Sequence, residues 1–405
     1  MKLLVVTSEY PNPGSDYDTP VVHYFVKEWM ALGHEVRVFH SRSVFPLIFY
    51  PAARMMKSAV KKFFKTDFIP HERLDEPRAF CHEGVEVVSM PVFKVFPHVR
   101  FFSRTIRKLA RAIFDRSSQA AFTPDVIICH FVDPQLPLIA ELKQLYPRAK
   151  ASLVVHEDPS VIAQRYGDRS RTLLEKVDFI GFRFEEMKAR YVAAHGPRSG
   201  LFLCPSGVPD EFILGRVPEG RFRSGPVTIC FTGMLIPLKN VDVLIDAVAE
   251  AFPDRDFRLR IAGKGFLEES LRARAAGLGG CVEFVGHLPR REIQRLFEAT
   301  DIFVMVSKPE AFGLVYLEAM AKGCIVVGTR GQGIDGVIQH GANGFLCGAR
   351  DMLELRDLLR GIRELSVDER EAISVRALAT AREYSDARVA ANYLVRIGVT
   401  PEELR

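Results

Sequence analysis

The sequence predicts an α/β protein made of two doubly wound, Rossmann-like domains that face each other across a cleft. Short apolar runs rich in β-branched residues alternate with stretches of helical spacing, which is the pattern of βαβ units with a parallel sheet. This alternation occurs twice along the chain, and 405 residues are enough for two such domains.

The first set of elements begins at the N-terminus. Residues 2–7 (KLLVVT) form a predicted strand buried on both faces, and 21–33 (VVHYFVKEWMALG) form a helix that ends at Gly33. Further strands are predicted at EVRVFH, DVIICHF (125–131), ASLVVHE (151–157) and DFIGFRF (178–184). A strand, a helix and a second strand within so short a segment indicate a parallel sheet covered by helices.

The second set begins near residue 226 and is a complete doubly wound unit. Strands are predicted at PVTICFTG, FRLRIAG, CVEFVGHL, DIFVMVS and CIVVGT, with helical stretches between them. The turn-rich segment 203–213 (LCPSGVPDEFI) separates the two sets. We therefore predict domains at 1–205 and 206–385, with a C-terminal helix over about 386–405 that packs back on the first domain.

Composition limits the classes of protein to consider. Hydrophobic residues make up 48% and charged residues 26%, which excludes a disordered or coiled-coil chain, and a net charge of +5 is too small to indicate a nucleic-acid partner. The seven cysteines show no CxxC spacing, so neither a zinc site nor a disulfide framework is predicted. No apolar run has the length of a signal-peptide core or a membrane span, so we expect a cytoplasmic location.

The most informative segment is 301–329, where the strand DIFVMVS ends in SKPE and a helix is predicted to open at Phe312–Gly313. Free amides at a helix N-terminus bind anions, and a glycine lets the backbone approach a phosphate closely. The residues expected to bind the phosphate are Ala311, Phe312, Gly313, Leu314 and Val315.

Two glutamates flank this predicted helix start. Glu310 lies in the loop before the amides, and Glu318 lies one to two turns into an apolar helix, where a carboxylate needs hydrogen-bond donors. The hydroxyls of a ribose would supply them. The alternative is that Glu310 only favours the helix N-terminus and that Glu318 pairs with a lysine.

The segment EAFGLVYLEAMAKG resembles the E-x7-E signature of retaining GT-B glycosyltransferases, particularly family 4. Nearly the whole chain shares the resemblance, through FTGMLIPLKNVDVLIDAVAEA, the stretch from IAGKGFLEES to DIFVMVS, and the hinge-like LCPSGVPDEF. The resemblance implies a nucleotide-diphosphate sugar as co-substrate, no essential metal, and a carbohydrate or lipid-linked acceptor in surface polysaccharide or glycolipid assembly. Nucleic acid is not expected as a partner.

The resemblance also implies residue roles in the second domain. Glu310 matches the glutamate that contacts the hydroxyls of the donor sugar, and Glu318 matches the one that holds the nucleotide ribose. Lys239, in the loop that starts at Gly233, matches the lysine that neutralises the donor diphosphate, although most lysines are simply solvated. The family usually has an arginine where Met234 stands. We expect another basic residue to replace it, and the candidates are Lys264 and Arg330 from neighbouring strand ends.

In the first domain, the resemblance points to His156, which ends the strand ASLVV and matches a histidine that lies over the donor sugar. The sequence VHEDPS replaces the usual histidine–glycine, so a structural histidine at the core edge is the alternative. His130 is a second candidate. The loop EYPNPGSDYDTP corresponds to a glycine loop near the diphosphate, of which Gly14 remains.

The segment GQGIDG (331–336) fits the GxGxxG pattern of dinucleotide-binding sites. It does not belong to the first βαβ unit, so we interpret it as the family's glycine-rich turn after CIVVGT. That turn usually carries a glutamate where Gly336 stands.

Two segments of the first domain, 53–68 and 98–116, combine basic and apolar residues. Both are predicted as basic amphipathic helices that contact an anionic membrane, which would place the protein peripherally on the inner face of the cell membrane. The alternative is a helix packed on the sheet with a solvated basic face.

These observations favour a metal-independent, retaining glycosyltransferase whose catalytic residues are His156, Lys239 and Glu310. One alternative is a phosphorylase or sugar-phosphate synthase on the same fold. The other is a catalytically silent nucleotide-sugar-binding scaffold, which the methionine at position 234 keeps open.

Overall fold

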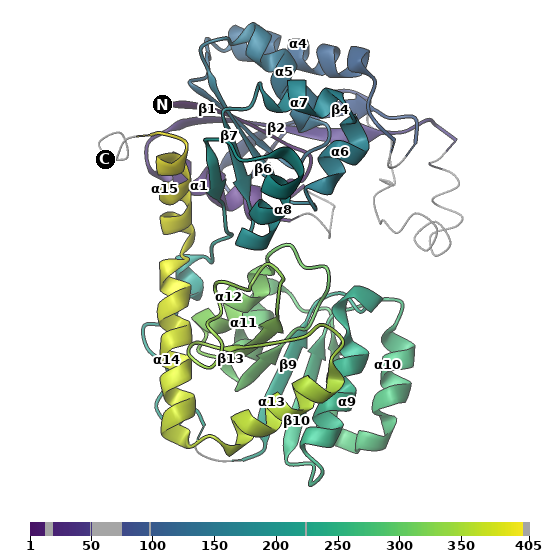
Figure 1. Ribbon diagram of the computed structural model, residues 1–405, viewed down its shortest axis with the longest axis vertical. Helices are drawn as coiled ribbons and strands as arrows, with labels where there is room; N and C mark the ends of the chain where they lie inside the picture. The colour runs from purple at the N-terminus through teal and green to yellow at the C-terminus, as the bar shows by residue number, and fades with distance from the viewer. Residues whose placement is uncertain (13–18, 49, 51–74, 97–98, 223–224, 400–405) are drawn as a thin grey trace. The chain divides into compact units, whose positions relative to one another are not determined.

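The computed structural model describes residues 1–12, 19–48, 50, 75–96, 99–222 and 225–399. The chain divides into two compact units (Figure 1). The first comprises Met1–Arg183, Met187–Cys204 and Ala390–Arg405, and the second comprises Phe184–Glu186 and Pro205–Val389. The longer segment of the second unit begins at Pro205.

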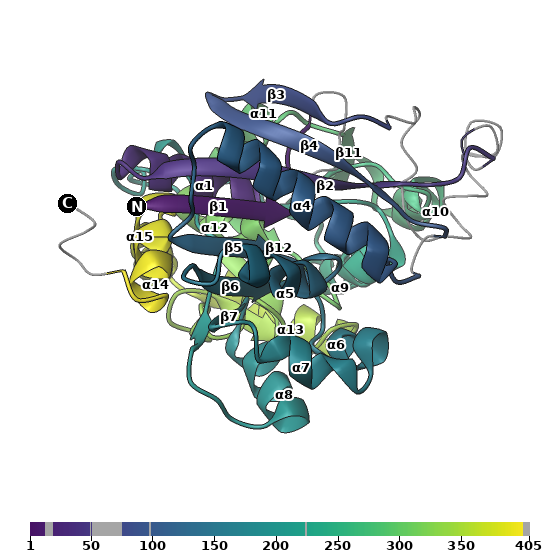
Figure 2. The same ribbon diagram turned by 90° about the horizontal axis from the view of Figure 1, so that it is seen from above.

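In the described residues of the first unit, eight strands form one sheet in the order β3-β4-β2-β1-β5-β6-β7-β8 (Figure 2). The strands are β1 Lys2–Thr7, β2 Glu35–Val44, β3 Arg78–His82, β4 Val85–Phe93, β5 Val126–His130, β6 Lys150–Val155, β7 Phe179–Phe182 and β8 Leu201–Leu203. The helices are α1 Val21–Ala31, α4 Ser103–Gln119, α5 Gln135–Leu145, α6 Ser160–Tyr166, α7 Arg169–Leu174 and α8 Glu185–His195. The β3–β4 pair is antiparallel, and the other neighbouring pairs of these described strands are parallel.

The C-terminal helix α15, Asp386–Arg396, belongs to the first unit from Ala390 onward. The indole Nε1 of Trp29 donates to the carbonyl of Ala390 at 3.0 Å, and the hydroxyls of Ser152 and Tyr393 lie 2.8 Å apart. Both large aromatic side chains are buried. The last helix therefore completes the core of the domain in which the chain began.

In the described part of the second unit, six strands form a parallel sheet in the order β11-β10-β9-β12-β13-β14. They are β9 Val227–Thr232, β10 Phe257–Ala262, β11 Val282–Gly286, β12 Ile302–Val304, β13 Ile325–Thr329 and β14 Phe345–Cys347. The helices are α9 Val241–Ala251, α10 Glu268–Ala275, α11 Arg290–Glu298, α12 Leu314–Ala321, α13 Met352–Glu364 and α14 Val367–Glu383. The predicted α/β class with two Rossmann-like domains is confirmed.

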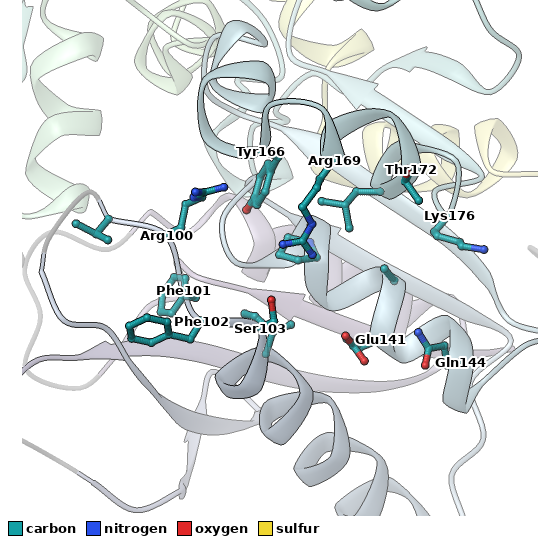
Figure 3. A pocket seen from close by; sticks show the side chains of 15 residues that line it. Arg100, Phe101, Phe102, Ser103, Glu141, Gln144, Tyr166, Arg169, Thr172 and Lys176 are labelled. Atoms are coloured by element: carbon teal, nitrogen blue, oxygen red, sulfur yellow. The ribbon is translucent and has the colours of Figure 1, made fainter.

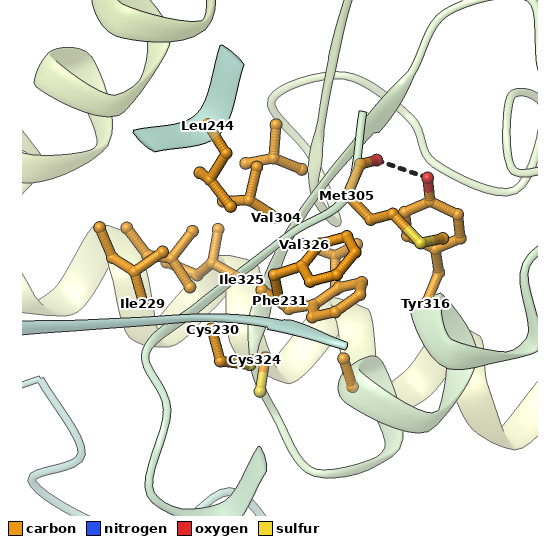
Figure 4. Packing of buried hydrophobic residues seen from close by; sticks show 14 of the residues in the cluster. Ile229, Cys230, Phe231, Leu244, Val304, Met305, Tyr316, Cys324, Ile325 and Val326 are labelled. Atoms are coloured by element: carbon orange, nitrogen blue, oxygen red, sulfur yellow. Dashed lines mark hydrogen bonds between the residues drawn. The ribbon is translucent and has the colours of Figure 1, made fainter. Parts of the chain in front are cut away.

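The core of the second unit holds the ends of its strands in place. Val304, Ile325 and Val326 pack between the sheet and its helices, and the hydroxyl of Tyr316 donates to the carbonyl of Met305 at 2.5 Å (Figure 4). Burying side chains of this size stabilises a fold by about 1.5–3 kcal/mol each. The loops that follow β9 and β12 therefore extend from a well-packed core.

Candidate functional site

The carboxyl ends of β9 and β12 bring two charged side chains together, 71 residues apart in the sequence. Lys239 ends a short 3-10 turn after β9, and Glu310 lies in the loop between β12 and α12. The Lys239 Nζ donates to the Glu310 Oε2 at 2.6 Å, and the Ser307 hydroxyl donates to the same oxygen at 2.8 Å. The two charged side chains are 18% and 13% exposed, so both can still be reached by a ligand.

The backbone fastens these two loops to each other. The amide of Lys308 donates to the carbonyl of Leu238 at 2.9 Å, and the Asn240 Nδ2 donates to the carbonyl of Val306 at 2.7 Å. Because these bonds take the chain away from the sheet after Val304, β12 ends three residues before the predicted strand does. The segment that follows β12 thereby brings Glu310 to Lys239.

The glycine-rich segment 331–336 supports Glu310 from the other side. The amide of Glu310 donates to the Gln332 Oε1 at 2.9 Å, and the amide of Gly333 donates to the carbonyl of Glu310 at 3.1 Å. A Cβ atom at Gly333 would lie 2.2 Å from the carbonyl oxygen of Ala311, so the two loops touch there. No helix follows this segment before β14, as expected for a turn and unlike a dinucleotide fingerprint. Sequence reasoning did not identify Gln332 or Ser307.

The predicted start of α12 needs a correction, and the anion site at its N-terminus stays a prediction. The helix begins at Leu314, after Gly313 in the left-handed conformation at φ 75°, and not at Phe312–Gly313. The side chain of Phe312 is buried in the core, and Ala311 lies in the loop before the helix. Of the five residues predicted to bind the phosphate, only Leu314 and Val315 therefore lie in the first turn of the helix.

Glu318 lies on α12 and has a charged partner that sequence reasoning missed. The Arg290 Nη2 donates to the Glu318 Oε1 at 2.8 Å, and the guanidinium of Arg290 stacks over Phe212 at 4.4 Å from the ring centroid. The alternative interpretation predicted a lysine partner, and the residue is an arginine from the start of α11. The side chain of Glu318 is 13% exposed and that of Arg290 is 37% exposed.

The two candidates for the missing arginine differ in their surroundings. The Arg330 Nη2 donates to a carboxylate oxygen of Glu354 at 2.6 Å. Lys264 is exposed, and its carbonyl accepts the amide of Leu235 at 3.0 Å, directly beside the exposed Met234. The loop that carries Lys264 therefore touches the loop that leads to the lysine at position 239.

This contact between the two loops requires a residue without a side chain at position 263. A Cβ atom at Gly263 would lie 1.8 Å from the carbonyl oxygen of Gly233, closer than any real contact. Both glycines also have positive φ angles, 144° and 153°. Glycine at these two positions thus permits the close approach of the loops that follow β9 and β10.

In the first unit, His130 and His156 lie together where β5 and β6 end. The His130 Nδ1 is 3.0 Å from the His156 Nε2, and Phe131 stacks on the ring of His156 at 4.1 Å between centroids. Burial lowers the pKa of His130 to about 3, with the charge of Arg183 as a smaller cause. Burial, followed by Arg183 and the neighbouring histidine, holds the pKa of His156 well below its usual value, so both rings are neutral at pH 7.

Two predictions on the first domain fall outside the described residues, namely those on Gly14 and on residues 53–68. For 98–116, the structure gives a helix, α4, that buries Ile106, Leu109 and Ile113. Its neighbours are α5 and β4. Because this apolar face is covered by protein, it is not free to lie on a membrane, and the expected contact with an anionic surface stays a prediction for the basic face. The exposed face keeps the basic side chains of Arg104, Arg107, Lys108, Arg111 and Arg116. Among the described helices, none is long and apolar enough to cross a membrane.

A pocket of about 530 Å³ lies in the first unit beside the start of α4 (Figure 3). Its walls come from residues 99–106, α5 and the region from Tyr166 to Lys176. Arg100, Arg169 and Lys176 contribute positive charge and Glu141 a negative charge, while the aromatic surface comes from Phe101, Phe102 and Tyr166. None of the residues predicted for the site lines this pocket.

The two Rossmann-like units give the chain the fold of the GT-B class of glycosyltransferases. The Anabaena protein HepE, solved in complex with UDP and glucose, superposes with a TM-score of 0.63 at 17% identity, over 98% of each chain. Sucrose-phosphate synthase from Thermosynechococcus elongatus superposes with a TM-score of 0.69 at 15% identity, over 97% of each chain. At such identities the likeness establishes the fold alone.

Residues 217–378 match the family model described as Glycosyl transferases group 1. D-inositol 3-phosphate glycosyltransferase of Geodermatophilus obscurus is 28% identical over 289 residues, which cover 66% of this chain and 62% of the relative. GDP-mannose-dependent alpha-(1-6)-phosphatidylinositol monomannoside mannosyltransferase of Mycolicibacterium smegmatis is 30% identical over 230 residues, which cover 51% of this chain and 58% of the relative.

The chain spans about three fifths of the length of these curated relatives. The comparisons support the expectation of a GT-B glycosyltransferase. The segment that matches the family contains Lys239, Glu310 and Glu318, so the charged cluster lies inside the matched domain.

Proposed function

We propose that the chain is a retaining glycosyltransferase that moves a sugar from a nucleoside-diphosphate donor to an acceptor hydroxyl. The observation that carries the proposal is the cluster of Lys239, Glu310 and Ser307 at the ends of β9 and β12, inside the matched domain. Parallel sheets bind ligands at the carboxyl ends of their strands. A cation and a carboxylate there supply charge for a diphosphate and an acceptor for sugar hydroxyls.

The ion pair between Lys239 and Glu310 suggests how donor binding proceeds. The diphosphate competes with the carboxylate for the ammonium, and the released carboxylate accepts hydrogen bonds from the sugar. As the glycosidic bond breaks, the leaving diphosphate gains charge, and a fixed ammonium then stabilises it more than in the ground state. This lysine and the N-terminus of α12 would neutralise the diphosphate without an essential metal.

The two glutamates have separate partners, which supports separate roles. Glu310 is held by Lys239 and Ser307, whereas Glu318 is held by Arg290. A double displacement uses two carboxyl groups about 5 Å apart on either side of the reacting bond. We propose instead that the departing phosphate deprotonates the acceptor hydroxyl on the same face, with no covalent sugar–enzyme intermediate.

We propose that the first unit binds the acceptor. A neutral His156 can orient a hydroxyl without adding charge, and the pocket with Arg100, Arg169 and Lys176 suits an anionic group. The two relatives described above act, by their names, on an inositol phosphate and on a phosphatidylinositol mannoside. A phosphate-bearing carbohydrate or lipid-linked acceptor, used in surface polysaccharide or glycolipid assembly, is consistent with both observations.

The function is tested by thermal-shift screening of the purified protein against UDP-, GDP- and ADP-sugars. A true donor at 100 times its Kd should stabilise the protein by about 2.7 kcal/mol. The stabilising donor is then incubated with candidate acceptors and the sugar product is measured. Binding without transfer or donor hydrolysis would indicate a silent scaffold, and turnover that depends on inorganic phosphate would indicate a phosphorylase.

We also propose a peripheral membrane contact through the exposed basic face of α4. Changing Arg104, Arg107 and Lys108 together to Gln should weaken binding to phosphatidylglycerol liposomes by about 3 kcal/mol, at about 1 kcal/mol for each charge. Co-sedimentation at rising salt measures it, because added salt shortens the range of the attraction.

The matched control for the membrane contact removes three exposed arginines of the second unit, Arg258, Arg291 and Arg295. Liposome binding should survive that change. If the wild-type protein ignores anionic liposomes at low salt, the face of α4 is an ordinary solvated surface.

A further inference from the structure

We propose that His23, His82 and Glu83 form a binding site for a divalent transition metal, best matched to Zn²⁺, that ties α1 to the β3–β4 hairpin. His23 lies in the first turn of α1, His82 ends β3, and Glu83 begins the turn to β4. One ligand atom from each of the three side chains lies within 4.8 Å of the other two. The site belongs to the first unit, whereas the Lys239–Glu310 cluster belongs to the second, so the two sites are distinct.

The spacing of the ligand atoms suits a tetrahedral ion. Zinc bonds to histidine nitrogen and carboxylate oxygen measure about 2.0–2.2 Å, which places neighbouring ligands of a tetrahedron about 3.3–3.6 Å apart. The His23 Nε2 is 3.4 Å from the Glu83 Oε2, inside this range. The ring of His82 meets that of His23 edge-on at 4.6 Å between centroids, and its partly exposed side chain can rotate to close the set.

His23 is prepared for this role by its surroundings. Its Nδ1 lies 2.8 Å from the hydroxyl of the buried Tyr10, which leaves the Nε2 to face the other two side chains. A ligating histidine usually uses its second nitrogen in such a bond, which fixes the orientation and tautomer of the ring.

The carboxylate of Glu83 is paired with the ammonium of Lys27. The Lys27 Nζ lies 2.9 Å from the Glu83 Oε2, and its side chain is 40% exposed. A divalent ion would displace this ammonium, which can move into solvent. Two histidines and one carboxylate leave the fourth position of the ion for water.

The sequence did not predict this site. His23 and His82 come from elements that are far apart in the chain, and zinc was considered only through the spacing of the cysteines. The β3–β4 hairpin was not among the predicted elements. Its turn, with Glu83 at φ 44° and Gly84 at φ 84°, carries the third ligand, and the second, His82, lies directly before it.

The test is a titration of the tag-free, chelator-treated full-length protein with Zn²⁺ by calorimetry. One equivalent should bind, and Co²⁺ should give the visible absorption of a four- or five-coordinate site. His82→Ala should lower the Zn²⁺ affinity at least about 10-fold, and Tyr10→Phe, which keeps the ring, should lower it about 10–100-fold. Lys27→Met should raise the affinity, because it removes the competing cation.

The matched control is His287→Ala, which removes an exposed histidine from the second unit and should leave the titration unchanged. If the wild-type protein binds no stoichiometric Zn²⁺ or Co²⁺, the three side chains form only a hydrogen-bonded cluster. The same holds if His82→Ala binds as tightly as the wild type. An equal loss in the His287 variant would indicate non-specific binding and overturn the site.

Discussion

Replacing Lys239 with alanine is expected to lower the turnover of sugar transfer about 10²–10³-fold, with a smaller loss of donor affinity. Its ammonium is paired with Glu310 at 2.6 Å, so donor binding exchanges one anionic partner for another. The gain comes later, when the leaving diphosphate develops charge. Steady-state kinetics with the donor found by screening measures kcat and KM separately.

Two companion variants sharpen this experiment. Lys264→Ala should cause a smaller loss if this exposed lysine replaces the arginine that Met234 displaces. Arg258→Ala removes an exposed cation from β10 of the same unit and should leave both kinetic parameters unchanged. A Lys239→Ala enzyme with a raised KM and a normal kcat would assign the lysine to ground-state binding only.

Glu318→Gln is expected to weaken the binding of both the donor and the free nucleoside diphosphate about 10-fold or more, because hydrogen bonds to a charged group contribute about 1.5–3 kcal/mol. Glu310→Gln should weaken the binding of the donor by a similar factor and leave the affinity for the free nucleotide unchanged. Its loss also leaves the ammonium of Lys239 without its carboxylate partner, which favours a diphosphate. Calorimetry with both ligands measures the split.

The control is Glu269→Gln, an exposed position on α10. Equal losses of both ligands in the two site variants would reject the division of roles. A Glu318→Gln protein with a lower Tm and normal nucleotide affinity would show that the Arg290 pair is structural, as the alternative interpretation of this glutamate holds.

The sequence by itself determined the alternation of strands and helices in both units, the loops that carry Lys239 and Glu310, and the helix that carries Glu318. These features are local: a buried strand is a continuous apolar run, a helix repeats with its turn, and polar residues at strand ends mark ligand-binding edges.

The tertiary structure decided what those residues touch. The pairing of Lys239 with Glu310, and of Arg290 with Glu318, joins side chains that the sequence separates by 71 and 28 residues. The sheet topology brings such residues together. The loops do the same, as in the turn that places Gln332 against the amide of Glu310.

Packing decided the remaining features. The apolar face of α4 is compatible with a lipid surface or with a protein core, and its contact with β4 and α5 shows that it belongs to the core. The β3–β4 hairpin became visible only in the sheet, where its turn brings His82 and Glu83 to His23. The physical reason is the same in each case: a periodic pattern shows that a face is buried, but only the folded chain determines which partner buries it.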